Sequence, residues 1–327
     1  MPKNAGQKIK LLMLYDILQR ETDEEHPLST EELIEKLREK GIEAAPRVLP
    51  RDISLLNEYG FEVLSYKKKS YYYYVAYRRF DTAELRVLID AVQAANFIPE
   101  AHTEDLARRL AGLAGKHRAE LLGRQTICFD TAKKNNMSIF YNIDGIERAI
   151  ESGKKVSFRY FTLDYAKNKV YHRNGERYIV NPIVLICERD NYYLVCYDDR
   201  HEGTANYRLD RMDGLKIEEE NIAERSEYKE FNPHTYRRQE FSMYVGALTE
   251  AEFVIDPSLS EEVFDKFGTG VTLHPDEEGN LHFRAKVQIS PAFFRWIVGS
   301  LGKIRLQAPE EAVKKFREFI AKIKTEY

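Results

Sequence analysis

The spacing of apolar residues changes along this chain, and this change limits the possible folds more than any other feature. Up to about residue 125, apolar residues recur mainly at helical spacing, as in Leu33, Ile34 and Leu37. From Lys155 onward, alternating runs typical of strands become common. With 327 residues, the chain is long enough for two or three domains. We therefore expect a multidomain α+β protein.

The first 80 residues predict three helices followed by a hairpin. Ser29 and Glu32 form a capping-box pattern at the start of the second helix, and Gly41 ends it. A basic turn, Lys67-Lys68-Lys69-Ser70, joins two tyrosine-rich strands. We expect these tyrosines to be strand and core residues rather than platforms for stacked bases. The layout is that of a winged helix-turn-helix.

The remaining sequence divides into three further regions. They are expected to be a helical linker, a small β-barrel of about five short strands, and a ferredoxin-like domain with the order βαββαβ. The expected domains span residues 1–80 (winged helix), 81–140 (linker), 141–225 (barrel) and 240–327 (ferredoxin-like domain).

Charge is distributed unevenly, although the formal net charge is only -3. Acidic residues predominate over residues 21–43 and basic residues over residues 46–80. A nearly neutral protein can still present a basic strip, and the local field governs polyanion binding.

Several protein classes are disfavoured. The cysteines Cys128, Cys187 and Cys196 form no C-x-x-C pair, which fits a reducing cytoplasm, and no apolar run reaches the roughly 18 residues of a membrane span. The apolar start of the chain is interrupted by Asp16 and reads as a helix rather than a signal peptide. No catalytic motif or metal-ligand spacing is present. We expect a cytoplasmic protein that is not an enzyme and uses no cofactor and no metal.

Four stretches in order resemble one family. They are Arg51-Asp52-Ile53-x-x-Leu56, Tyr192-Tyr193-Leu194, Tyr207-Arg208-Leu209-Asp210-Arg211-Met212, and the tail from Ile289 to Pro309. Together they are similar to bacterial transcriptional regulators with an N-terminal winged helix, a WYL domain and a C-terminal (WCX-like) extension. The resemblance implies a DNA-binding regulator, an Sm-like or SH3-like barrel that senses a ligand, and an extension that helps to form a homodimer. Where a ligand is suggested in the family, it is a nucleic-acid strand.

The DNA-binding candidates lie on the third helix and in the hairpin. The residues are Arg47, Arg51, Ser54, Lys67, Lys68 and Lys69. The sequence departs from the family at Pro46 and Pro50, so the helix either starts at Pro50 or is kinked there. Alternatively, Arg51 pairs with a carboxylate of its own domain, and the lysines form a solvated turn that protects the hairpin edge.

The ligand candidates combine arginines, which bind phosphate, with tyrosines, which stack on bases or donate to phosphate. They are Tyr160, Tyr193, Arg208 and Arg211, with Arg177 as a weaker candidate and Arg295 from the tail. Arg208 and Arg211 converge only if the chain turns after Leu209. Alternatively, Arg211 pairs with Asp210 or Asp213, Tyr193 is a core residue, and Arg295 forms a helix-surface salt bridge.

Two functions remain open. The first is a homodimeric regulator that binds duplex DNA and senses a single-stranded nucleic acid or another anionic ligand in the barrel. The second is an accessory protein whose barrel binds single strands, with a degenerate winged helix; the departures at Pro46 and Pro50 motivate it.

Overall fold

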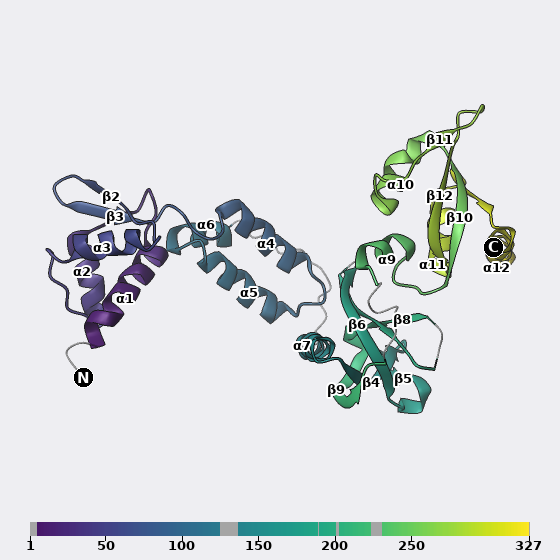
Figure 1. Ribbon diagram of the computed structural model, residues 1–327, viewed down its shortest axis with the longest axis horizontal. Coiled ribbons are helices and arrows are strands. Elements are labelled where there is room, and N and C mark those ends of the chain that lie inside the picture. The colour runs from purple at the N-terminus through teal and green to yellow at the C-terminus, as the bar shows by residue number, and fades with distance from the viewer. Residues whose placement is uncertain (1–4, 125–136, 189, 201–202, 224–230, 327) are drawn as a thin grey trace. The chain divides into compact units, whose positions relative to one another are not determined.

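The computed structural model describes residues 5–124, 137–188, 190–200, 203–223 and 231–326. Cys128 and parts of the expected linker and barrel boundaries lie outside these ranges. The chain forms two compact units, residues 1–135 and 136–327, and each is described separately (Figure 1). The structure is mixed α+β, with N-terminal helices and a curled sheet in the second unit.

Three helices and a small sheet form the first part of unit 1. The elements are α1 (Ala5–Glu21), β1 (Leu28–Ser29), α2 (Thr30–Glu39), α3 (Leu49–Glu58), β2 (Leu64–Lys67) and β3 (Tyr71–Tyr74). The capping box predicted at Ser29 and Glu32 is confirmed, with reciprocal hydrogen bonds at 3.2 Å and 2.7 Å. The sheet order is β1-β3-β2, and all pairs are antiparallel. The four consecutive tyrosines form strand β3, as expected, but only Tyr73 is buried in the core, so the expected core role is wrong for the other three.

The second part of unit 1 is helical, as expected. Its helices are α4 (Thr82–Ala94), α5 (Glu100–Gly112) and α6 (Lys116–Arg124). Leu85, Ile89 and Leu122 are among the buried residues that form its separate small core.

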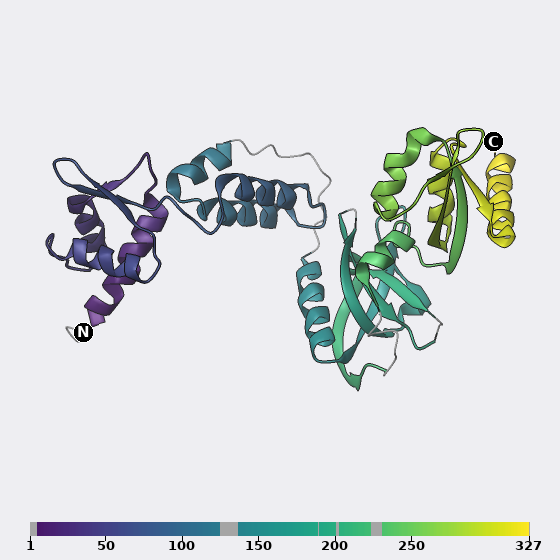
Figure 2. The same ribbon diagram turned by 45° about the horizontal axis from the view of Figure 1, so that its top comes forward.

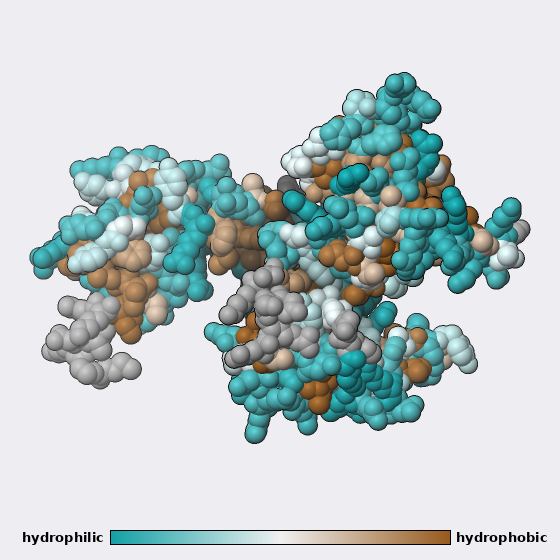
Figure 3. Space-filling model, turned by 45° about the vertical axis from the view of Figure 1, so that its right-hand side comes forward, coloured by the Kyte–Doolittle hydropathy of each residue, from teal (hydrophilic) through white to brown (hydrophobic). Residues whose placement is uncertain are grey.

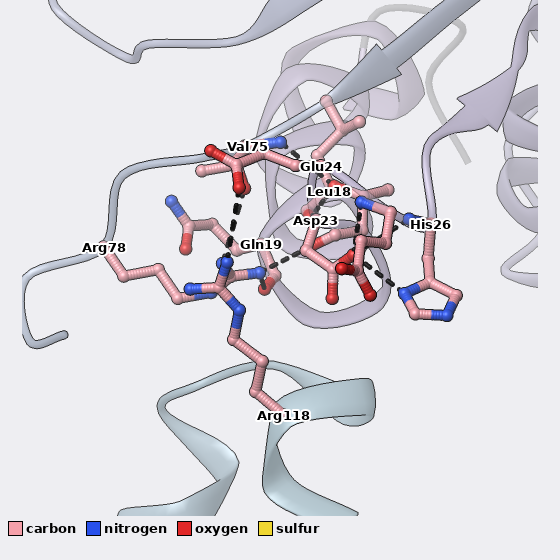
Figure 4. A network of polar contacts seen from close by, with 10 residues as sticks. Leu18, Gln19, Asp23, Glu24, His26, Val75, Arg78 and Arg118 are labelled. Atoms are coloured by element: carbon pink, nitrogen blue, oxygen red, sulfur yellow. Dashed lines mark hydrogen bonds and ion pairs between the residues drawn. The ribbon is translucent and has the colours of Figure 1, made fainter. Parts of the chain in front are cut away.

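Arg78 and Arg118 lie where the two parts of unit 1 meet. Its guanidinium donates hydrogen bonds to the backbone carbonyls of Gln19 and Thr22 at 3.0 Å and 2.5 Å, and Arg118 of α6 forms an ion pair with Glu24 (Figure 4). Burial lowers the pKa of Arg78, because the charged form loses water. The ion pair between Arg118 and Glu24 therefore joins α6 to the three-helix part, whereas the hydrogen bonds of Arg78 stay within that part.

Unit 2 begins with a helix that packs against a six-stranded curled sheet (Figure 2). The elements are α7 (Ser138–Glu151), β4 (Lys154–Leu163), β5 (Lys169–Tyr171), η1 (His172–Gly175), β6 (Tyr178–Glu188), β7 (Asn191–Tyr197), β8 (Thr204–Arg208), η2 (Leu209–Arg211) and β9 (Met212–Asn221). The order is β5-β4-β6-β7-β8, and β9 also pairs with β4. Five of these strands were expected. The three-residue edge strand β5 was missed, because it is too short for alternation to be detected.

The rest of unit 2 contains a four-stranded sheet and several helices. They are α9 (Pro233–Gln239), β10 (Ala247–Ile255), η3 (Pro257–Leu259), α10 (Ser260–Phe267), β11 (His274–Pro275), β12 (Leu281–Ile289), α11 (Pro291–Gly299), β13 (Ile304–Ala308) and α12 (Glu310–Glu326). The sheet order is β11-β12-β10-β13, all antiparallel. The second strand of the expected order is the two-residue β11, which pairs with β12 beyond a turn in which Asp276 accepts the N–H groups of Glu278 and Asn280.

The visible surface of the protein is largely hydrophilic, and large aromatic side chains are buried inside. Figure 3 shows hydrophilic residues over much of the visible surface, with smaller hydrophobic patches between them. The aromatic core of the four-stranded sheet, which includes Phe253, Phe283 and Phe293, is buried.

Gly115 should be sensitive to substitution because its φ is +82° and an added Cβ would lie 2.7 Å from a guanidinium nitrogen of Arg78. We predict that Gly115→Ala lowers the free energy of unfolding of unit 1 by about 1–3 kcal/mol. Gly112→Ala is the matched control, since a Cβ there meets no atom within 4 Å. Calorimetry of both variants should show a lower transition temperature for Gly115→Ala alone; equal transitions would contradict the contact.

Candidate ligand cavity and nucleic-acid interface

Helix α3 directs the first set of candidates to solvent. Leu49, Ile53 and Leu56 are buried, whereas Arg51 and Ser54 lie on the exposed face and Arg47 is exposed in the preceding turn. The helix starts at Leu49, so Pro50 falls in its first turn, where the backbone N–H has no helical partner to lose. Of the two alternatives left by the sequence, a helix start near Pro50 is therefore the one observed, although the first helical residue is Leu49.

Arg51 forms no ion pair with any described residue, so the alternative of an internal partner is not observed. The adjacent Asp52 instead pairs with Lys10 of α1 at 2.6 Å, and both side chains are buried. The aspartate of this motif thus links α3 to α1, while the arginine remains available to a partner outside the domain.

The hairpin places Lys67, Lys68 and Lys69 at its exposed tip. Within the described residues, no carboxylate pairs with any of them. Residues 63–80 contain no Asp or Glu. The hairpin is therefore a local source of positive potential in a chain of small negative net charge.

A cavity of about 730 Å³ in unit 2 brings together five of the six ligand candidates. Tyr160 comes from β4, Tyr193 from β7, Arg208 from β8, Arg211 from η2 and Arg295 from α11. The turn required for Arg208 and Arg211 to converge is present, because Leu209–Arg211 form a 3-10 turn directly after β8.

Arg208 is fixed in place within the cavity wall. Its guanidinium donates two hydrogen bonds to Asp210, at 3.0 Å and 2.8 Å, and a third to Asn191 at 2.6 Å. Burial is the largest single effect and disfavours its charge, but the hydrogen bond to Asp210 and the attraction of the Asp210 charge, with smaller contributions from Tyr193 and Tyr160, together raise the pKa of Arg208. Arg208 is therefore a rigid cation whose charge is largely balanced.

Arg211 and Arg295 supply the unbalanced positive charge. Among the described residues neither forms an ion pair; the possible partners Asp210 and Asp213 instead bind Arg208 and Arg159. Arg295 lies with its guanidinium 5.6 Å from the ring centre of Tyr244. The alternatives in which both arginines are neutralised are thus not observed, and an anion would meet two available guanidinium groups.

The cavity tyrosines present neutral hydroxyl groups. Burial raises the pKa values of Tyr160 and Tyr193, so both remain protonated at neutral pH. The Tyr160 hydroxyl accepts the backbone N–H of Arg208 at 3.2 Å and keeps its own hydrogen for donation. Tyr193 is half-buried: it lines the cavity and also packs against a small hydrophobic core that includes Ile186 and Val195.

Arg177 does not line this cavity. It donates to the hydroxyl and carbonyl of Ser157 at 2.9 Å and 2.7 Å and to the carbonyl of Gly214 at 2.6 Å. These bonds connect β4 and β9 to the residue just before β6, so the structure gives Arg177 a role in the sheet rather than at the cavity.

Sequence reasoning missed the wall formed by Ser242–Val245. Ser242 and Met243 have φ values of 54° and 59°, and the Met243 carbonyl accepts the amide N–H of Asn206 at 2.9 Å. This wall follows α9, and no periodic pattern marks it. A second cavity, of about 870 Å³, shares Arg295, Glu188 and Ser242 with the first.

The middle of the chain also matches a known family model. The model described as "WYL domain" matches residues 142–217. The chain contains a WYL domain. The first matched residue, Asn142 of α7, is buried, and its side-chain amide donates to the Leu209 carbonyl at 2.9 Å. Helix α7 is therefore bonded to the turn that carries Arg211. The WYL domain thus supplies four of the five candidates that line the cavity.

Comparisons with whole proteins add little to this domain assignment. No curated protein matches the chain. Proteasome accessory factor B/C of Arthrobacter aurescens aligns with 97% of this chain at 17% identity and a TM-score of 0.30, and the chain spans about half (48%) of that protein's length. A CRISPR Cas-related protein aligns with 99% of this chain and 85% of its own at 10% identity and a TM-score of 0.37. These scores are too low for either structure to inform function.

The described residues contain no group of three or more His, Cys, Asp or Glu side chains placed to hold a metal ion. None of their helices has the length and apolar character needed to cross a membrane.

Two arginines of the WYL domain should differ in their effect on stability. We predict that Arg177→Met lowers the free energy of unfolding of unit 2 by about 2 kcal/mol, because its bonds to the backbone are lost. Arg211→Met should change it by about 0.5 kcal/mol or less, because no bond is removed. Calorimetry measures both variants, and a larger loss for Arg211→Met would contradict the assignment of the two roles.

Proposed function

We propose that this protein is a DNA-binding transcriptional regulator whose WYL domain senses an anionic ligand. In this proposal the first part of unit 1 is a winged helix-turn-helix: α3 enters the major groove, and the β2–β3 hairpin contacts phosphates. The observation that carries the proposal is that Arg47, Arg51 and Lys67–Lys69 are exposed and form no ion pair with described residues.

The cavity supports sensing rather than catalysis. Its unpaired cations, Arg211 and Arg295, suit phosphate, and its tyrosine rings suit bases, so a nucleic-acid strand is the ligand class that best fits. Arg295 comes from the four-stranded, ferredoxin-like domain, so ligand binding would favour one placement of that domain on the WYL domain. We therefore propose no catalytic role for this cavity.

We further propose that the protein is cytoplasmic and that it works as a homodimer on duplex DNA. Palindromic half-sites separated by about one helical turn, or a multiple of it, follow from such symmetry. The alternative, an accessory protein whose cavity binds single strands, is supported by the missing side-chain cap at Val48, which leaves the start of α3 less well fixed.

Selection of genomic duplex fragments by the purified full-length chain tests the regulator proposal. We predict enrichment of specific duplex sites and a steep loss of affinity as salt rises. Arg51→Ala should weaken binding to an enriched site about 5- to 100-fold. Arg38→Ala is the control, since Arg38 is exposed on α2 and already pairs with Glu35. Binding of single strands without enrichment of any duplex would favour the accessory protein instead.

The cavity makes a separate prediction for the ligand. Arg211→Ala and Arg295→Ala should each weaken binding of a fluorescent 5′-phosphorylated oligothymidylate about tenfold or more, because each removes a charge-assisted bond. Asp265→Ala is the control, because this exposed carboxylate lines only the second cavity. Unchanged affinity in both arginine variants would place the ligand elsewhere.

A further inference from the structure

The outer side of the β2–β3 hairpin carries an aromatic surface that duplex binding does not explain. The register pairs Leu64 with Tyr74 and Tyr66 with Tyr72, so these four side chains share one face of the hairpin. We call it the tyrosine face. Tyr73 points to the opposite face and is buried in the core.

The rings of the tyrosine face pack on one another rather than on the core. Tyr66 and Tyr72 are stacked with centroids 5.5 Å apart and an interplanar angle of 13°, and Tyr74 lies 6.4 Å from Tyr66. None of the three belongs to the hydrophobic core of the three-helix part. The rings are therefore held in fixed orientations by each other and by the strand register.

Positive charge lies directly beside these rings. The ammonium group of Lys68 is 5.3 Å from the centre of the Tyr66 ring, and Lys69 follows it at the exposed tip. Lys67 pairs with Tyr71, and its ammonium lies 5.5 Å from the centre of that ring, at the edge of the opposite face. As shown above, none of the three lysines has a carboxylate partner among the described residues. Ring faces next to unpaired cations are the combination that binds the bases and phosphates of an unpaired strand.

We propose that the tyrosine face and the adjacent lysines bind single-stranded nucleic acid, with bases stacked on Tyr66 and Tyr72 and phosphates bound by the lysines. Duplex DNA is a poorer fit, because its base faces are already stacked and only base edges reach a protein. A second copy of the same face is also a poorer fit, because it would bring lysines against lysines. This site is separate from the WYL cavity and does not depend on duplex recognition.

The test compares the binding affinities of two probes that are 12 nucleotides long and have equal backbone charge: an oligothymidylate and an abasic oligonucleotide. It uses the full-length chain carrying Arg211→Ala and Arg295→Ala, so that the cavity contributes little. We expect about tenfold tighter binding of oligothymidylate, since stacking requires bases. Tyr66→Val with Tyr72→Val should remove this preference, whereas Tyr66→Phe with Tyr72→Phe should keep it. Replacing Lys67, Lys68 and Lys69 with Gln should weaken the binding of both probes equally.

Tyr71→Val is the matched control, because Tyr71 lies on the same strand but on the opposite face. The proposal is overturned if the valine pair keeps the preference, or if no preference exists in the starting protein. Should the valine pair fail to fold, photo-crosslinking of 5-iodouracil oligomers to the unaltered chain decides. Crosslinks at Tyr66, Tyr72 or Tyr74 support the site, and crosslinks confined to Tyr160 or Tyr193 refute it. Loss of duplex enrichment alone bears only on the regulator proposal.

Discussion

Two aspartates decide which arginines of this protein are available to a partner. Asp52 follows Arg51 in sequence but binds Lys10 across the three-helix core. Asp210 precedes Arg211 but binds Arg208 through two hydrogen bonds. In both places the carboxylate fixes local structure and leaves the neighbouring arginine unpaired. Since an exposed cation keeps its attraction for anions only when no carboxylate neutralises it, the proposed functions at α3 and at the cavity depend on this pairing.

The same pairing allows the surface at α3 and the wall of the cavity to be rigid while Arg51 and Arg211 keep an unpaired charge. Lys10 and Asp52 are both buried, so removing either would leave the other charged group without its partner. Arg208 likewise fixes the wall beside Arg211, and its bond to Asn191 extends that wall to β7. A cation held next to a fixed wall loses less conformational freedom on binding than one on a mobile loop.

Much of the architecture follows from local signals in the sequence. The capping box at Ser29, the helix over residues 51–58 and the strands around Tyr193 each have a pattern that spans a whole element. The convergence of Tyr160, Tyr193, Arg208 and Arg211 was expected from residue type and family resemblance, and the turn at Leu209–Arg211 makes it possible. Other features depend on distant contacts. The bonds of Arg177 to Ser157 and Gly214, and the outward side of the tyrosine face, are set by strand register, which no local pattern specifies.

The availability of the unpaired arginines can be measured directly by phenylglyoxal modification followed by mass spectrometry. On the full-length chain, Arg51, Arg211 and Arg295 should react faster than Arg208 and Arg177, whose guanidinium groups are bound to protein acceptors. Addition of an enriched duplex fragment should protect Arg47 and Arg51. If Arg51 and Arg211 prove as unreactive as Arg208, or if duplex leaves Arg51 unprotected, then these arginines are not the nucleic-acid contacts proposed here.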